Sequence, residues 1–108
     1  MKDEQIERIK AAVESADHIS ADKKAELLRL LSKLKPAIAR ASQTHGDHAE
    51  KIGRLIEASA HEATKKPPES AKNLVRALEQ SVEKFEASHP ELVAAVTEYT
   101  AFLSALGI

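Results

Sequence analysis

The sequence predicts an all-α fold, a small antiparallel bundle of four to five helices in a single domain, residues 1–108. Apolar residues recur at spacings of three and four, the period of an amphipathic helix, and the alternating runs typical of strands are missing. The chain has 108 residues, of which 43% are hydrophobic, and this is one domain's worth of sequence. Because Ala alone supplies 19 of the hydrophobic residues, we expect a thin core with close contacts between small side chains.

Two helices are expected at the N-terminal end. The first covers residues 3–16, where Asp3 is a possible N-cap and the narrow apolar stripe predicts a helix that frays easily. After a turn at 17–20, Ser20 is a good N-cap for the second helix, whose leucines lie on one broad face. Pro36 lies inside this helix and removes a backbone hydrogen bond, so we expect a kink near it. The sequence leaves open whether the helix is kinked or broken there.

A third helix is expected over residues 48–65, after a turn at 42–47. Asp47 and Glu50 resemble a capping box at its start. The Lys-Lys-Pro-Pro run at 65–68 cannot continue a helix, so it predicts the clearest internal linker of the chain.

This linker separates the N-terminal helices, residues 1–66, from a C-terminal helical hairpin, residues 69–108. The connecting turn is predicted near 66–69. The first helix of the hairpin is expected at about 70–87, and the second begins after a turn at 88–90 and ends at Gly107, a C-cap residue.

The hairpin turn carries two helix signals at once. Ser88 is expected to cap the last helix while Glu91 returns to the Ser88 amide, and Pro90 fits the first turn of that helix. Phe85 is expected to pack on the far helix near Val96 or Tyr99, because a short turn pairs positions equidistant from it. The residues predicted to form the hairpin core and turn are Phe85, Ser88, His89, Pro90 and Tyr99.

Two C-terminal segments resemble a known family: FEASHPEL at 85–92, and LSALGI at 103–108, which closes an apolar helix. They are similar to the C-terminal signature of short bacterial helical proteins of domain-of-unknown-function family 4404. The first half is similar more loosely, through an amphipathic helix, a turn and the leucine-rich run at 27–31, whereas the region 39–68 departs from the family's pattern. The resemblance implies a cytoplasmic bacterial helical protein and supplies no catalytic residues.

Composition excludes several classes of site. The chain has no Cys, which excludes disulfides, thiolate metal ligands and Cys nucleophiles. The longest uncharged stretch, 99–108, is about half of the roughly 20 residues that a bilayer requires, so no membrane span is expected. The N-terminal segment lacks the apolar run of a secretory signal, so we expect a cytoplasmic protein.

The histidines offer two weak signals. His45 and His48, with Asp47 and Glu50 nearby, could suit zinc or nickel, but Gly46 between them favours a solvated loop. The sequence therefore leaves metal binding there open and predicts no metal, cofactor or catalytic residue, and we do not expect an enzyme. The histidine of the hairpin turn, at position 89, has two interpretations, a pH-responsive hinge or simple packing within the turn.

Charge is the more informative pattern, although the net charge is only −1. A basic row lies opposite the leucines of the second helix, and an acidic row lies on the first helix of the hairpin. These rows could steer the helices of two protomers, or of a partner, into register; the alternative is ordinary solvated faces. The basic row is Arg29, Lys33 and Arg40, and the acidic row is Glu79, Glu83 and Glu86.

The sequence therefore predicts a non-catalytic helical module that acts through protein contacts, as a homodimer or as an adaptor. Five amphipathic helices in so short a chain should leave an apolar patch unless another chain covers it. The alternative is weak binding of nucleic acid or another polyanion through the basic face of the second helix. A sequence pI near 6.5 and the scarcity of aromatic residues argue against that alternative.

Overall fold

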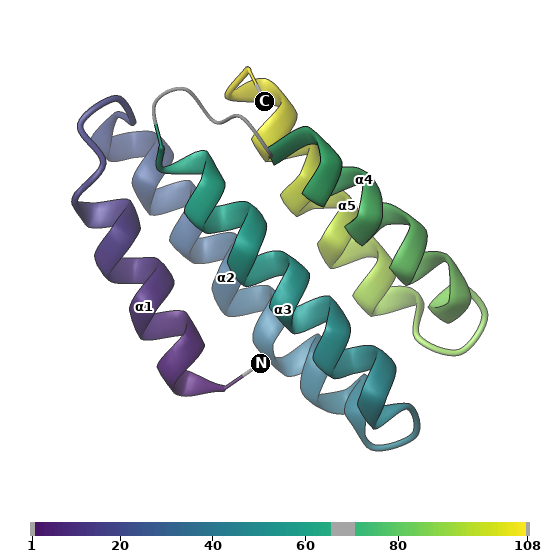
Figure 1. Cartoon of the computed structure of the whole chain (residues 1–108). Helices are drawn as coiled ribbons and strands as arrows, with labels where there is room; N and C mark the ends of the chain where they lie inside the picture. Colours follow the sequence, from purple (N-terminus) through teal and green to yellow (C-terminus); the bar gives the residue numbers. More distant parts are fainter. Residues whose placement is uncertain (1, 66–70, 108) are drawn as a thin grey trace.

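The computed structural model describes residues 2–65 and 71–107, and within them it confirms the predicted all-α bundle. Each successive helix runs back along the one before it (Figure 1). The predicted turn at 66–69 lies outside the described residues. The elements are α1 (Asp3–Glu14), α2 (Ala21–Ser42), α3 (Gly46–Ala63), α4 (Ala71–Val82), the 3₁₀ helix η1 (Glu83–Phe85) and α5 (Pro90–Ala105).

Four of the helices enclose the core. α2 packs on α3 and α5, and α4 packs on the same two helices, which closes a four-helix arrangement. α1 lies along α2 and α3 on the side away from α4 and α5 (Figure 1). Its fully buried apolar side chains are Ile9 and Val13, so it contributes the narrow stripe that its sequence predicts.

The broad leucine face of α2 is buried as predicted. Leu27, Leu31 and Leu34 are at most 1% exposed, and they belong to one cluster that also contains the core residues of α3 and α5. Tyr99 and Phe85 are among the largest fully buried side chains. All three of the chain's aromatic residues, including Phe102, therefore contribute to the core.

α1 differs from the prediction at both of its ends, and α2 resolves one of the two alternatives that the sequence left open at Pro36. The N-cap of α1 is Lys2, not Asp3, and the helix ends at Glu14 rather than at residue 16. α2 is not broken at Pro36 but continues to Ser42, because the proline ring lies on the exposed side of the helix, where water can replace the lost hydrogen bond. The kink at this position stays a prediction.

Besides the cap of α1, one further predicted cap in the N-terminal half is confirmed and one is wrong. The Ser20 side chain accepts a hydrogen bond from the Lys23 amide at 3.2 Å, so Ser20 caps α2 as predicted. α3 begins at Gly46, two residues before the predicted start, and the capping box from Asp47 to Glu50 does not form.

The C-terminal hairpin also confirms some predictions and contradicts others. Pro90 occupies the start of α5 and Gly107 has a φ of 91° after its end, as predicted. The Ser88 cap is wrong, because the N-cap is His89, whose side chain makes no capping bond. The predicted helix at 70–87 is shorter, since α4 ends at Val82 and tightens into η1.

Candidate functional site

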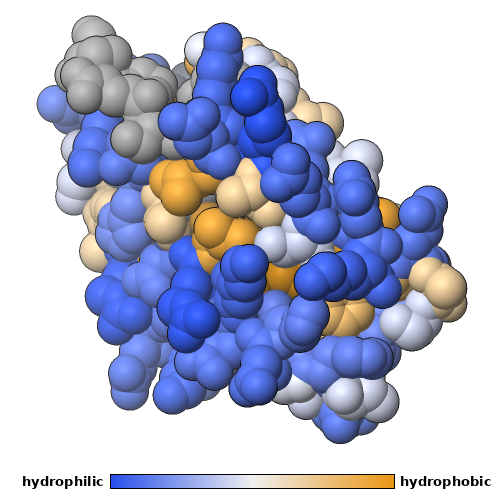
Figure 2. Space-filling view, turned by 45° about the vertical axis from the view of Figure 1, so that its right-hand side comes forward, coloured by the Kyte–Doolittle hydropathy of each residue, from blue (hydrophilic) through white to orange (hydrophobic). Residues whose placement is uncertain are grey.

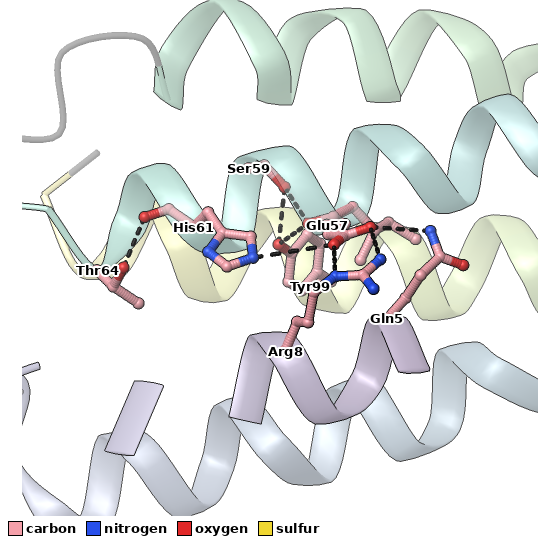
Figure 3. A network of polar contacts seen from close by, with 8 residues as sticks. Gln5, Arg8, Glu57, Ser59, His61, Thr64 and Tyr99 are labelled. Atoms are coloured by element: carbon pink, nitrogen blue, oxygen red, sulfur yellow. Dashed lines mark hydrogen bonds and ion pairs between the residues drawn. The ribbon is translucent and has the colours of Figure 1, made fainter. Parts of the chain in front are cut away.

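A polar network joins α1 to α3 (Figure 3). The half-buried Glu57 carboxylate accepts hydrogen bonds from Arg8 Nε and Gln5 Nε2, each at 2.9 Å. His61 Nε2 lies 3.9 Å from the same carboxylate. The hydrogen bond from Arg8 holds the pKa of Glu57 below its usual value. The network fixes α1 on the bundle, and sequence reasoning missed it because the partners are about fifty positions apart.

A second polar group in the same view is fully buried. The Tyr99 hydroxyl donates to the Ile56 carbonyl at 3.1 Å and lies 2.7 Å from Ser59 Oγ (Figure 3). Burial raises the pKa of Tyr99, so the phenol is neutral. With 0% exposure for both side chains, this pair has no access to a substrate and holds α5 against α3.

The predicted basic row of α2 is neutralised within the chain. Lys33 Nζ lies 3.5 Å from Glu98, and Arg40 Nε lies 3.6 Å from Glu91, both on α5. Arg29 pairs with Glu26 on α2 itself, and its hydrogen bond lowers the pKa of that carboxyl. No observation on this face favours binding of a nucleic-acid phosphate over these pairs, although such exposed pairs are individually weak.

The predicted acidic row lies on the other side of the molecule. Glu79, Glu83 and Glu86 are exposed, and within the described residues their side chains make no recorded hydrogen bond or ion pair. The structure therefore does not bring the two predicted rows together. One row is paired inside the protomer, and the other faces solvent.

Two basic residues that sequence reasoning missed share the edge of the acidic row. Lys72 and Arg76 precede Glu79 and Glu83 at successive spacings of four, three and four, which places all of them along one edge of α4 and η1. All are exposed, and the first two also lack a recorded partner among the described residues. We call these four residues the α4 edge. The heptad-like spacing in the sequence is the signal that could have found it.

Three histidines at the starts of α3 and α5 gather around Phe85. Its ring centroid lies 5.4 Å from that of His45, 6.3 Å from His48 and 5.8 Å from His89. Thr44 Oγ1 lies 3.0 Å from Nδ1 of His45 and 3.0 Å from Nε2 of His89, which ties the α2–α3 turn to the α4–α5 turn. This packing favours the second interpretation of the hairpin histidine.

No described group of three or more His, Asp or Glu side chains is arranged to hold a metal ion. His45 and His48 are instead exposed at the start of α3 beside the aromatic ring. Phe85 is 1% exposed and belongs to the same core cluster as Val96 and Tyr99, so the prediction that its ring is buried is confirmed.

Over the part of the chain that the structure describes, the apolar patch expected from the sequence is reduced to partly buried side chains. Among residues 2–65 and 71–107 no large hydrophobic side chain is exposed, because the thin core still takes in the apolar stripe of every helix. Figure 2 shows one face on which apolar surface forms a shallow strip ringed by polar side chains. The partly buried hydrophobic residues packed against the core are Ile6, Leu28, Leu55, Val93 and Leu106.

Comparison of the chain with protein-family models, with curated proteins and with solved structures returned no match. The similarity to domain-of-unknown-function family 4404 therefore stays a prediction. Among the described helices, none combines the length and the apolar character needed to cross a bilayer.

Proposed function

We propose that the protein is a non-catalytic helical module of the cytoplasm that acts through protein contacts, and that its partner is a second copy of this chain bound along the α4 edge. The observation that carries the proposal is the order of charge on that edge. Lys72 and Arg76 occupy the N-terminal half of the helix, whereas Glu79 and Glu83 follow at its C-terminal end.

This order is unfavourable in an isolated protomer. The helix dipole favours acidic residues in the first turn and basic residues in the last, and α4 has neither. Each half of the edge also places two like charges four residues apart, which repel each other. A local arrangement that costs stability is most often retained where it serves a contact.

Antiparallel pairing of two α4 helices relieves both costs. With a two-fold axis between positions 77 and 78, Lys72 faces Glu83 of the other copy and Arg76 faces Glu79 of the other copy. The symmetry repeats each pair, so one patch supplies both halves of the interface. The basic start of each helix also lies beside the acidic end of its neighbour, which opposes the two helix dipoles.

The proposed dimer is weak and sensitive to salt. An exposed ion pair contributes about 0.2–1 kcal/mol, and no large hydrophobic side chain is exposed among the described residues to add apolar burial. The expectation of an apolar interface is therefore replaced by a charged one. Screening over about 10 Å at an ionic strength of 0.1 M would weaken it further.

Sedimentation equilibrium tests the proposal with charge reversals on two helices. At low ionic strength, and from about 10 μM to about 1 mM protein, the unmodified chain should dimerise and the E79K/E83K variant should be monomeric. The matched control is E7K/E14K, which makes the same change of charge at exposed positions of α1 and should leave dimerisation largely unchanged. An unmodified chain that stays monomeric, or a control that dissociates as fully as E79K/E83K, would overturn the proposal.

A further inference from the structure

A hollow between α3 and the end of α4 is lined by more basic than acidic side chains. Its volume is 330 Å³, within the lower range of small-ligand sites. We propose that it binds a small phosphate ester. The residues that line it are Asp47, His48, Lys51, Arg54, Ser81 and Lys84.

The two walls of the hollow supply cations from different elements. Lys51 and Arg54 stand on α3, and Lys84 stands on η1 across from them. These three basic side chains outnumber the two nearby carboxylates, that of Asp47 in the lining and that of Glu50 beside Arg54. Arg54 is oriented by Glu50, whose carboxylate lies 3.1 Å from Nη1. The two lysines have no recorded ion pair or hydrogen bond within the described residues, so their ammonium groups remain available to an oxyanion.

Two further polar side chains complete the lining. Ser81 is half-buried, and its hydroxyl makes no recorded hydrogen bond among the described residues. The His48 ring stands edge-on to the buried Phe85 at 6.3 Å, which places an imidazole at a fixed wall of the hollow. The first turn of α3 adjoins these residues, and its N-cap His45 gives it no side-chain cap, so the positive end of that helix adds to the same field.

The size and the donor set identify the class of ligand. A tetrahedral phosphoryl group matches several cations and a hydroxyl that converge from two walls, and the volume leaves room for only a short organic group. Asp47 would repel a bare phosphate but can accept a hydrogen bond from a hydroxyl group of the ligand. The site therefore favours a phosphate ester that carries a hydroxyl group over inorganic phosphate.

This inference does not rest on the proposed dimer. Ser81 and Lys84 lie on the side of α4 and η1 that faces α3, whereas Glu79 and Glu83 lie on the opposite edge by helical spacing. A monomeric chain could therefore bind the ester, and a dimeric chain could lack the site.

Nuclear magnetic resonance titration of the ¹⁵N-labelled full chain with glycerol 3-phosphate tests the site. We expect saturable amide shifts at 47–51 and 81–84, and a loss of affinity of about fivefold or more in K51A and in K84A. S81A should weaken binding without a change of charge. The matched control is K10A, which removes an exposed lysine of α1 and should bind as tightly as the unmodified chain. Shifts that do not saturate, or equal losses in K10A and K84A, would overturn the inference.

A comparison with inorganic phosphate shows whether the hollow prefers a phosphate ester to a simple anion. D47A removes the like charge and the hydrogen-bond acceptor together, so its affinity for inorganic phosphate should rise, whereas the preference for glycerol 3-phosphate should shrink. An equal gain for both ligands would contradict the assignment of a hydroxyl-bearing ester.

Discussion

α2 and α4 each bury an apolar face and carry a row of like charge on the outside, yet the two rows differ in what they meet. α2 packs against three helices, α1, α3 and α5, and the acidic side chains of α5 lie within reach of its basic row. α4 packs against α3 and α5, and the side chains of its outer edge are exposed and have no recorded ion pair among the described residues. The same sequence pattern therefore forms ion pairs within the protomer in α2, whereas in α4 it faces solvent.

The ends of the two helices differ in the same sense. α2 has the Ser20 cap, Asp22 in its first turn and Arg40 in its last, so its charges follow the helix dipole. α4 reverses that order, with Lys72 at its start and no basic residue in its last turn. Local sequence thus stabilises α2 by itself, whereas α4 depends on its inner packing and, in our proposal, on a second copy.

The largest effect is expected where α4 and η1 are held by packing alone. Phe85→Ala removes a ring that is 1% exposed and should cost about 3–5 kcal/mol of the free energy of unfolding. Denaturant melts measure it. Ser88→Ala, three residues away on the exposed turn, is the matched control and should cost almost nothing, because Ser88 does not cap α5. Equal costs would show that the ring does not hold this end of the bundle.

A smaller effect is expected for the buried hydroxyl that ties α5 to α3. Tyr99→Phe removes the bonds to Ser59 and to the Ile56 carbonyl and should cost about 1–1.5 kcal/mol at neutral pH in the same melts. Ser59 keeps its own bond to the Ile56 carbonyl at 3.0 Å, so the variant leaves no buried donor unsatisfied. A cost near zero would contradict the assigned hydrogen bonds.

Because of this phenol, the free energy of unfolding should depend on pH in the alkaline range. Burial raises the pKa of Tyr99 in the folded state, so the unfolded chain loses this proton first. The contribution of the phenol to the free energy of unfolding is fully present below about pH 10, the ordinary pKa of tyrosine, and falls as the pH rises above that value. Melts of the unmodified chain and of Tyr99→Phe across this range should converge; parallel curves would show that the phenol is not protected.

Loss of the α2 cap is expected to lower the free energy of unfolding by about 1 kcal/mol. Ser20→Ala removes the side-chain acceptor at the start of α2 and should destabilise the fold by that amount in thermal or denaturant melts. The matched control at position 88 should not. A cost for Ser88→Ala equal to that of Ser20→Ala would mean that the serine, rather than His89, caps α5.

The smallest effects belong to the two charged rows. A double-mutant cycle between Lys33 and Glu98 should give a coupling of about 0.2–1 kcal/mol in denaturant melts, because the pair is exposed. The cycle between Lys33 and Glu79 is the control and should give none. Equal coupling energies in the two cycles would contradict the distinction between the basic row of α2, which is paired within the protomer, and the acidic row of α4, which faces solvent.

Features set by neighbouring residues could be predicted from the sequence, and features set by distant ones could not. The leucine face of α2, the Ser20 cap and Pro90 at the start of α5 follow from local spacing and side-chain chemistry. The N-cap positions of α3 and α5 were wrong because His45 and His89 are drawn onto the Phe85 ring, which is a tertiary contact.

The candidate site was predicted in part for the same reason. The acidic row could be found from its spacing, but the α5 partners of Lys33 and Arg40 lie more than fifty positions away. No local pattern shows that Arg40 meets Glu91, or that Lys51 and Lys84 share one hollow. The spacing of Lys72 and Arg76 was present in the sequence, and its meaning depends on the observation that the side chains of this edge of α4 are exposed.

Reversal of the whole α4 edge tests the central claim most directly. The variant K72E/R76E/E79K/E83K keeps the net charge and places acidic residues at the start of α4 and basic residues at its end, which also suits the helix dipole. Sedimentation equilibrium at low ionic strength should show that K72E/R76E and E79K/E83K are each monomeric, whereas the fourfold variant dimerises with a Kd within about threefold of the unmodified chain. A fourfold variant that stays monomeric while the unmodified chain dimerises would contradict antiparallel pairing of α4.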